Sequence, residues 1–128
     1  MARMLDGMER LLRREVAPPP PATLIGMRLA SFAVGTVQGG ILAALADAAM
    51  GWAYMTTLGE GESYTTLEMK VNFLRPARSG PLTARARVLS AGRTIGLVEC
   101  AVLGDGDKLV AHAVSTCMIL RGEQAAGR

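Results

Sequence analysis

The chain has 128 residues, of which half are hydrophobic, a formal net charge of +3 and a mean hydropathy of +0.27. This length fits one domain that buries roughly two-thirds of the surface of its unfolded chain. The basic excess is small and scattered and only five residues are aromatic, which argues against a nucleic-acid-binding protein.

The first 21 residues predict a helix followed by a proline-rich linker. Apolar residues recur at helical spacing from Met4 to Val16, and a run of prolines from Pro18 to Pro21 ends the pattern. Charged residues stand where a signal peptide needs an apolar core, so we expect a cytoplasmic protein. In that compartment Cys100 and Cys117 are expected to be buried, reduced thiols.

The segment from residue 22 to residue 58 predicts a short strand, a glycine-containing loop at 35–40 and a helix from Ile41 to about Leu58. Small residues in this helix indicate that other elements enclose it tightly. Asp47 is the only carboxylate in the apolar run, and Gly39 and Gly40 stand just before it. An ionised carboxylate is costly to bury, so we expect Asp47 to be paired, protonated or functional. The same charge argues against a membrane span.

The remainder predicts four strands joined by short turns. In the first, Leu67, Met69 and Val71 alternate with polar residues, which places Thr66 opposite the core face. Short connections favour an antiparallel sheet, with the helix across one face and a flexible tail at 122–128. The predicted strands cover residues 64–75, 82–90, 94–103 and 109–120 of an α+β domain at 22–121.

Few other residues suggest a catalytic or metal-binding role. His112 is the only histidine and is expected to be a packed strand residue rather than a catalytic base. The run from Gly104 to Lys108 is explained by a hairpin turn and lacks the spaced ligands of a calcium loop. No metal site is expected.

Three motifs together resemble the hotdog-fold acyl-CoA thioesterases, with the PaaI-like (phenylacetic acid degradation) subfamily as the branch most similar. The resemblance runs from about Leu24 to Leu120, and its motifs are Val37-Gln38-Gly39-Gly40 with Ala46-Asp47-Ala48-Ala49, Val71-Asn72-Phe73-Leu74-Arg75-Pro76, and Ala111-His112-Ala113-Val114-Ser115-Thr116-Cys117. It implies a long helix wrapped by an antiparallel sheet, a homodimer with active sites at its interface, and pairing of dimers into a tetramer.

The resemblance also implies roles for individual residues. Asp47 would be the nucleophile or general base at a thioester carbonyl, and the backbone N–H of Gly39, from the opposite subunit, would polarise that carbonyl. Gln38 and Thr66 would complete the catalytic set, with Thr65 as an alternative to Thr66. No cofactor is implied, since coenzyme A is part of the substrate, and the coenzyme A contacts would be Gly40, Arg75, Gly92, Arg93 and Thr94.

Two departures from the family leave a second interpretation open. Most relatives have histidine where this chain has Gln38, whose amide can donate a hydrogen bond but cannot shuttle a proton. Relatives also have roughly one more strand before the segment that matches Gly39 and Gly40. A strand rises ~3.3 Å per residue. The alternative is therefore a non-catalytic hotdog protein that binds acyl-CoA or serves as an oligomeric scaffold. A hydratase of the same fold is a distant third.

Overall fold

The computed structural model describes residues 36–78 and 81–127. The expected N-terminal helix, the proline-rich linker and the short strand before residue 34 lie outside these residues. The described elements are helix α4 (Gly39–Met55), strands β1 (Ser63–Phe73), β2 (Thr83–Ala91), β3 (Ile95–Leu103) and β4 (Leu109–Leu120), and the 3-10 helices η1 (Asp105–Asp107) and η2 (Gly122–Ala125).

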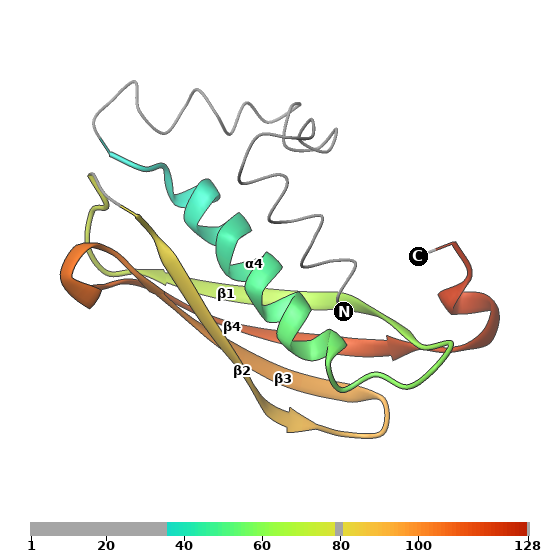
Figure 1. The fold of residues 1–128 in the computed structure, drawn as a ribbon. Coiled ribbons are helices and arrows are strands. Elements are labelled where there is room, and N and C mark those ends of the chain that lie inside the picture. The colour runs from blue at the N-terminus through green and yellow to red at the C-terminus, as the bar shows by residue number, and fades with distance from the viewer. Residues whose placement is uncertain (1–35, 79–80, 128) are drawn as a thin grey trace.

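The four strands form one antiparallel sheet in the order β1-β4-β3-β2, so β1 and β2 are the edges among the described strands. Helix α4 lies across one face of this sheet (Figure 1). The predicted α+β hotdog architecture is confirmed for the described residues. The tail, expected to be flexible, contains η2, and η1 forms the turn between β3 and β4.

Helix α4 begins two residues earlier and ends three residues earlier than the sequence predicts. At its end the hydroxyls of Thr56 and Thr57 donate to the carbonyls of Ala53 and Tyr54, at 2.6 and 2.7 Å. The same two carbonyls also accept the backbone N–H groups of Thr56 and Thr57, so the last turn tightens to i→i+3 bonds before the helix ends.

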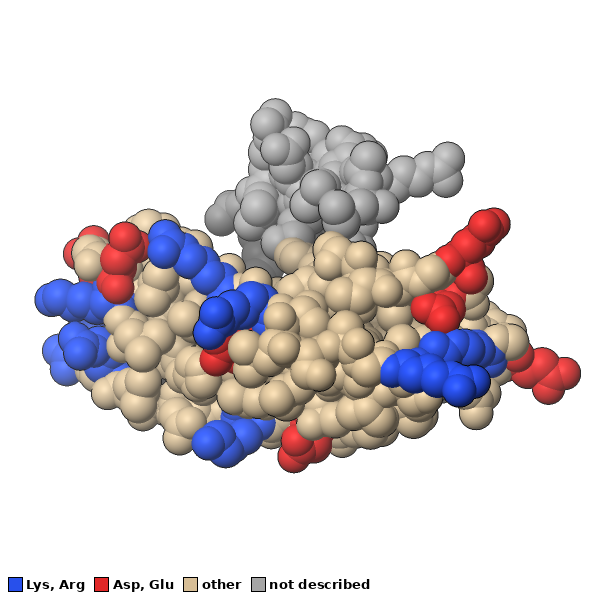
Figure 2. Space-filling model, turned by 90° about the horizontal axis from the view of Figure 1, so that it is seen from below, with Lys and Arg blue, Asp and Glu red and all other residues tan. Residues whose placement is uncertain are grey.

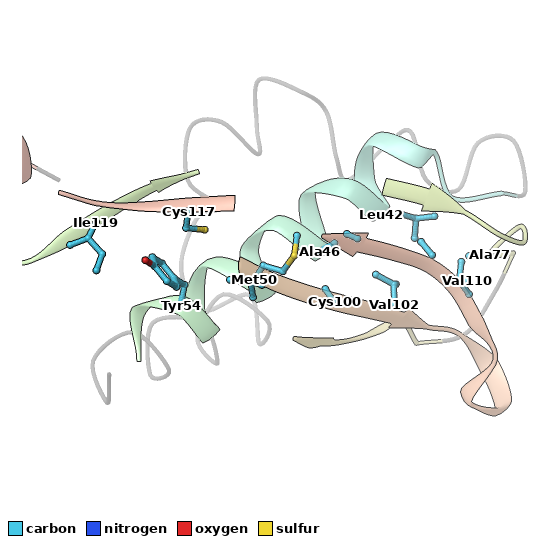
Figure 3. Packing of buried hydrophobic residues seen from close by; sticks show 13 residues of the cluster. Leu42, Ala46, Met50, Tyr54, Ala77, Cys100, Val102, Val110, Cys117 and Ile119 are labelled. Carbon is cyan, nitrogen blue, oxygen red and sulfur yellow. The ribbon is translucent and has the colours of Figure 1, made fainter. Parts of the chain in front are cut away.

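One stripe of α4 supplies the helical side of the core. Leu42, Ala46, Met50 and Tyr54 recur every four residues and are almost completely buried against the sheet. Figure 3 shows these side chains along the helix, with Cys117 and Ile119 near Tyr54. The strand contribution to the core includes Val98, Cys100, Val102, Val110, Ala111, Ala113, Cys117 and Ile119.

Two glycines allow tyrosine rings to approach the backbone closely. A Cβ on Gly96 would collide with the ring of Tyr54, and a Cβ on Gly51 would collide with the hydroxyl of Tyr64. The two rings meet edge to face, with centroids 5.8 Å apart. The hydroxyl of Tyr54 is buried and has no hydrogen-bond partner among the described residues.

Strand β1 corrects the expected placement of Thr66. Its register with β4 shifts between Thr66 and Glu68, because Leu67 forms a β-bulge and is 51% exposed. Thr66 therefore pairs with the buried Cys117 and faces the helix, as Met69 does beyond the bulge. A bulge inserts one extra residue and reverses the alternation of faces.

The face of the sheet turned away from α4 carries a cross-strand ion cluster. The Glu99 carboxylate accepts from Arg87 Nε at 2.5 Å and lies 3.2 Å from His112 Nε2. His112 is thus a strand residue with a structural partner, as predicted. Figure 2, a view from below, shows charged groups of both signs separated by broad uncharged areas.

This cluster predicts a defined pH dependence of stability. Hydrogen bonds from Arg87 and then His112 hold the pKa of Glu99 below its ordinary value of 4.5. A depressed carboxylate pKa stabilises the fold above pH 4.5, and this contribution disappears as the pH falls through the lower folded value. In urea titrations from pH 7 to pH 3, Glu99→Gln should lose less stability than the natural chain. Glu60→Gln, at an exposed glutamate without a described ion pair, should behave like the natural chain. Equal losses for the natural chain and Glu99→Gln would contradict the prediction.

The two cysteines are buried free thiols, as the sequence predicts. Burial raises the pKa of the Cys100 and Cys117 thiols, so both stay protonated at neutral pH. Among the described residues, no helix is long and apolar enough to cross a membrane, and no group of metal-ligating side chains has the size of a metal site.

Candidate active site

Asp47 is exposed in the single chain, which corrects the expectation of a buried carboxylate. Its neighbour Ala46 belongs to the stripe that faces the sheet, so Asp47 points about 100° away from that stripe. Ala48 beside it is exposed as well. The chain therefore presents a carboxylate at its surface, in the middle of an apolar helix.

The charge of this carboxylate acts on two side chains of the sheet, one on β1 and one on β4. Burial, then the negative charge of Asp47, raises the pKa of the Tyr64 phenol. The Cys117 thiol also senses Asp47, although burial dominates its raised pKa and hydrogen bonds from Ser115 and Thr66 oppose it. Tyr64 and Thr66 thus share the helix-facing side of β1, and Tyr64 lies within range of the charge of Asp47.

Gly39 stands at the first position of α4, after the N-cap residue Gln38. The Gln38 backbone is extended, at φ −63° and ψ 141°, and its carbonyl accepts from Ile41 and Leu42. In the described part of the chain, no backbone carbonyl accepts from the N–H of Gly39 or Gly40. A helix start with unpaired N–H groups favours an oxygen that carries negative charge. The Gln38 side chain is exposed and makes no cap hydrogen bond.

A hollow of about 480 Å³ lies beside this helix start. The Phe73 ring forms one wall and lies so close to Gly39 that a Cβ there would stand 3.1 Å from it. Arg75 is exposed at the rim. The complete lining consists of Val37, Gly39, Leu42, Phe73, Leu74, Arg75, Pro76 and Ala77.

A second hollow of similar size lies at the other end of the helix, between α4 and the start of β1. Met55 and Leu58 supply its apolar wall, while Tyr64 and Thr66 extend it toward Asp47. Glu62 lies in the same lining and is held by the Gly59 N–H at 2.8 Å and by Arg121 at 2.9 Å, which lower its pKa. These contacts fix the loop between α4 and β1.

The residues expected to contact coenzyme A fall into two separate groups. Gly40 and Arg75 lie at the start of α4, with Gly39. Gly92, Arg93 and Thr94 form the exposed turn between β2 and β3, where the Arg93 carbonyl accepts from Arg121 and the Thr94 carbonyl from Ile119. This turn adjoins the last turn of α4, because Gly96 contacts Tyr54. One chain does not bring the two groups together.

The same distance argument applies to the two main catalytic candidates. Gly39 and Asp47 are eight residues apart on one straight helix, which is about 12 Å along its axis at 1.5 Å per residue. A single carbonyl cannot touch both groups of one chain. If the two residues act on one substrate, they must come from two copies.

Sequence reasoning missed Tyr64 and Phe73, which flank the two catalytic candidates. Tyr64 stands among half-buried strand residues, and Phe73 is exposed at the end of its strand. Their positions depend on Gly51 and Gly39, which are distant in the chain. Gly51, a glycine within an apolar helix, was the residue of the sequence that could have indicated the close approach of a side chain to the helix backbone.

Comparison with known proteins gives one consistent similarity. The model of the "Thioesterase superfamily" matches residues 34–111. A protein of Saccharolobus solfataricus that is provisionally named an esterase is 32% identical over 87 residues, which are 68% of this chain and 57% of that protein. The chain thus matches little more than half the length of that relative.

Two solved structures share the fold and about a third of the sequence. A phenylacetic acid degradation-related protein from Ralstonia eutropha JMP134 has a TM-score of 0.66 and 35% identity, over 86% of this chain and 97% of that chain. A Bacillus halodurans protein crystallised with CoA has a TM-score of 0.67 and 31% identity, over 71% and 60% of the respective chains.

Proposed function

Since the chain belongs to the thioesterase superfamily, we propose that it hydrolyses acyl-CoA thioesters to a free acid and coenzyme A, in a homodimer. The observation that carries this proposal is the arrangement along α4, where an exposed carboxylate and an unpaired helix start are about 12 Å apart. The carboxylate would supply the base or nucleophile of an acyl-transfer site, and the helix start would supply the N–H group that stabilises the oxyanion.

Pairing of two β1 edges would join these two parts of the site. β1 is an edge strand, and its outer edge can accept a second β1 in antiparallel orientation. A two-fold axis between Met69 and Lys70 would set Thr66 of one strand opposite Phe73 of the other. Tyr64, two residues before Thr66 on the same face of β1, senses the charge of Asp47, and Phe73 lies beside Gly39. This pairing would therefore bring Asp47 close to Gly39 of the partner subunit.

The chemistry follows from these groups. Asp47 acts as a general base that takes a proton from water while the water oxygen bonds to the thioester carbon. Alternatively it attacks that carbon itself, and water then hydrolyses the resulting mixed anhydride to the free acid and the Asp47 carboxylate. The Gly39 N–H of the partner subunit stabilises the oxyanion. The C–S bond then breaks, and coenzyme A leaves as a thiolate that takes up a proton. Thr66 is placed to orient the water, and Gln38 to donate to the carbonyl.

Acyl-CoA is the proposed substrate, with an aryl-acyl or medium-length acyl group. The phenylacetic acid-related neighbour and the neighbour crystallised with CoA support this class and the PaaI-like branch. The two hollows of about 480 Å³ each have the size of small-molecule sites. The exposed Arg75 is suited to a coenzyme A phosphate. We also propose that the protein is a dimer of dimers located in the cytoplasm.

The test is hydrolysis by the purified full chain of phenylacetyl-, benzoyl-, hexanoyl- and decanoyl-CoA, followed with a thiol reagent. We expect CoA release from at least one of these thioesters, with saturation kinetics and a rate far above that of an Asp47→Ala control. Release no faster than that of the control for every thioester would overturn the proposal.

The alternative is a hotdog protein that binds acyl-CoA without turning it over. The feature that favours it is the exposed Gln38, which cannot act as a proton shuttle. Isothermal titration with coenzyme A distinguishes the two functions. Binding of coenzyme A together with no hydrolysis of any thioester would support the alternative.

A further inference from the structure

Tyr64 lies in a notch on α4, one helical turn beyond Asp47. Its hydroxyl occupies the place where a Cβ on Gly51 would stand, so no residue larger than glycine fits there without displacing the phenol. Residues 47 and 51 are four apart and share one helix face, with Cβ positions roughly 5–6 Å apart. The hydroxyl therefore lies on the helix face that carries the exposed Asp47 side chain, close enough for the carboxylate charge to act on the phenol.

The surroundings hold the phenol in this orientation. Tyr64 is half-buried, and its ring meets the buried Tyr54 edge to face at 5.8 Å. Its hydroxyl has no hydrogen-bond partner among the described residues. Burial and the charge of Asp47 raise the pKa of the phenol, so that it keeps its proton and can donate at neutral pH.

We propose that Tyr64 is a positioning residue, whose hydroxyl donates a hydrogen bond to the Asp47 carboxylate and holds it toward the reacting carbonyl. The catalytic consequence rests on the proposed function, whereas the contact itself does not. The titratable groups that face Asp47 are Tyr64 on β1 and the protonated Cys117 on β4. The only other ionisable side chain of α4 is Tyr54, which faces the sheet.

The first experiment measures the pH dependence of kcat for Tyr64→Phe. Loss of a hydrogen bond to the ionised carboxylate should move the acid limb of kcat upward by about one pH unit and lower kcat several-fold, with KM little changed. Tyr54→Phe is the matched control, because it removes a hydroxyl without a described partner from the adjacent ring. Its pH profile should equal that of the natural chain. An acid limb that stays in place for Tyr64→Phe would overturn the proposal.

The second experiment does not depend on activity. The chain has two tyrosines, so Tyr54→Phe leaves Tyr64 as the only one. The ¹³Cζ resonance of Tyr64 in this variant should shift between pH 3 and pH 7 as Asp47 ionises. The shift should vanish when Asp47→Asn is added, and it should shrink with Gly51→Ala, which displaces the phenol. Circular dichroism checks that each variant is folded.

The outcomes separate the two proposals. If the Tyr64 resonance follows Asp47 but no thioester is hydrolysed, the contact is confirmed and the proposed function fails. If thioesters are hydrolysed but the resonance does not respond to Asp47, the role of Tyr64 is overturned and the proposed function stands.

Discussion

Replacing Asp47 by asparagine is expected to lower kcat for acyl-CoA hydrolysis by about 10²–10⁴-fold, with a small change in KM. Asparagine has the same shape as aspartate but can neither accept the proton of the attacking water nor attack the carbonyl. The loss therefore isolates the chemistry of the carboxylate from its size. The measurement is steady-state release of CoA at neutral pH.

The fold should be unaffected by this substitution, because Asp47 is exposed and makes no described hydrogen bond or ion pair. We expect its thermal midpoint to change by no more than that of a typical surface variant. The matched control is Asp105→Asn, the same chemical change at an exposed position in η1. An Asp47→Asn variant with full activity, or an equal loss for Asp105→Asn, would contradict the assignment.

The sheet could be predicted from the sequence because its signals are local. The strand at 109–120 has the bounds that its alternation predicts, and a glycine–aspartate turn precedes it. The helix was recognisable from its composition, although its ends were not. It ends in i→i+3 backbone bonds that the hydroxyls of Thr56 and Thr57 accompany, and nothing in the periodicity reveals such an end.

The faces of β1 could not be predicted, because they depend on a pairing partner. Alternation alone places Thr66 away from the core, and only the register with β4 reveals the bulge at Leu67. The environment of Asp47 was misjudged for a related reason. Its apolar neighbours in sequence suggested burial, but they lie on other sides of the helix, and Asp47 itself is exposed in the single chain.

Replacing Gly39 by proline is expected to lower kcat by about 10²–10³-fold, because it deletes the N–H that would stabilise the oxyanion. The backbone tolerates proline at this position. Gly39 is the first helical residue, where proline is favoured, and the extended Gln38 before it has the conformation that a residue preceding proline needs. The measurement is kcat with the thioester that the natural chain hydrolyses best.

Gly39→Ala is the control for this change. Alanine places the same Cβ 3.1 Å from the Phe73 ring but keeps the N–H, so the crowding that this Cβ causes appears in both variants. We expect the alanine variant to retain most of the kcat that the proline variant loses. Similar losses in both variants would mean that space beside Phe73 matters, and that the N–H does not.

Mixing the two inactive variants tests whether each site is shared between subunits. In a dimer of one Asp47→Asn chain and one Gly39→Pro chain, one site combines the intact Asp47 with the intact Gly39, and the other site has neither. After free exchange at equal concentrations, half of the dimers are mixed, so about a quarter of the natural activity should return. A site built within one chain would regain nothing on mixing. Recovery of activity would therefore establish that α4 contributes its carboxylate to one site and its N-terminus to the other.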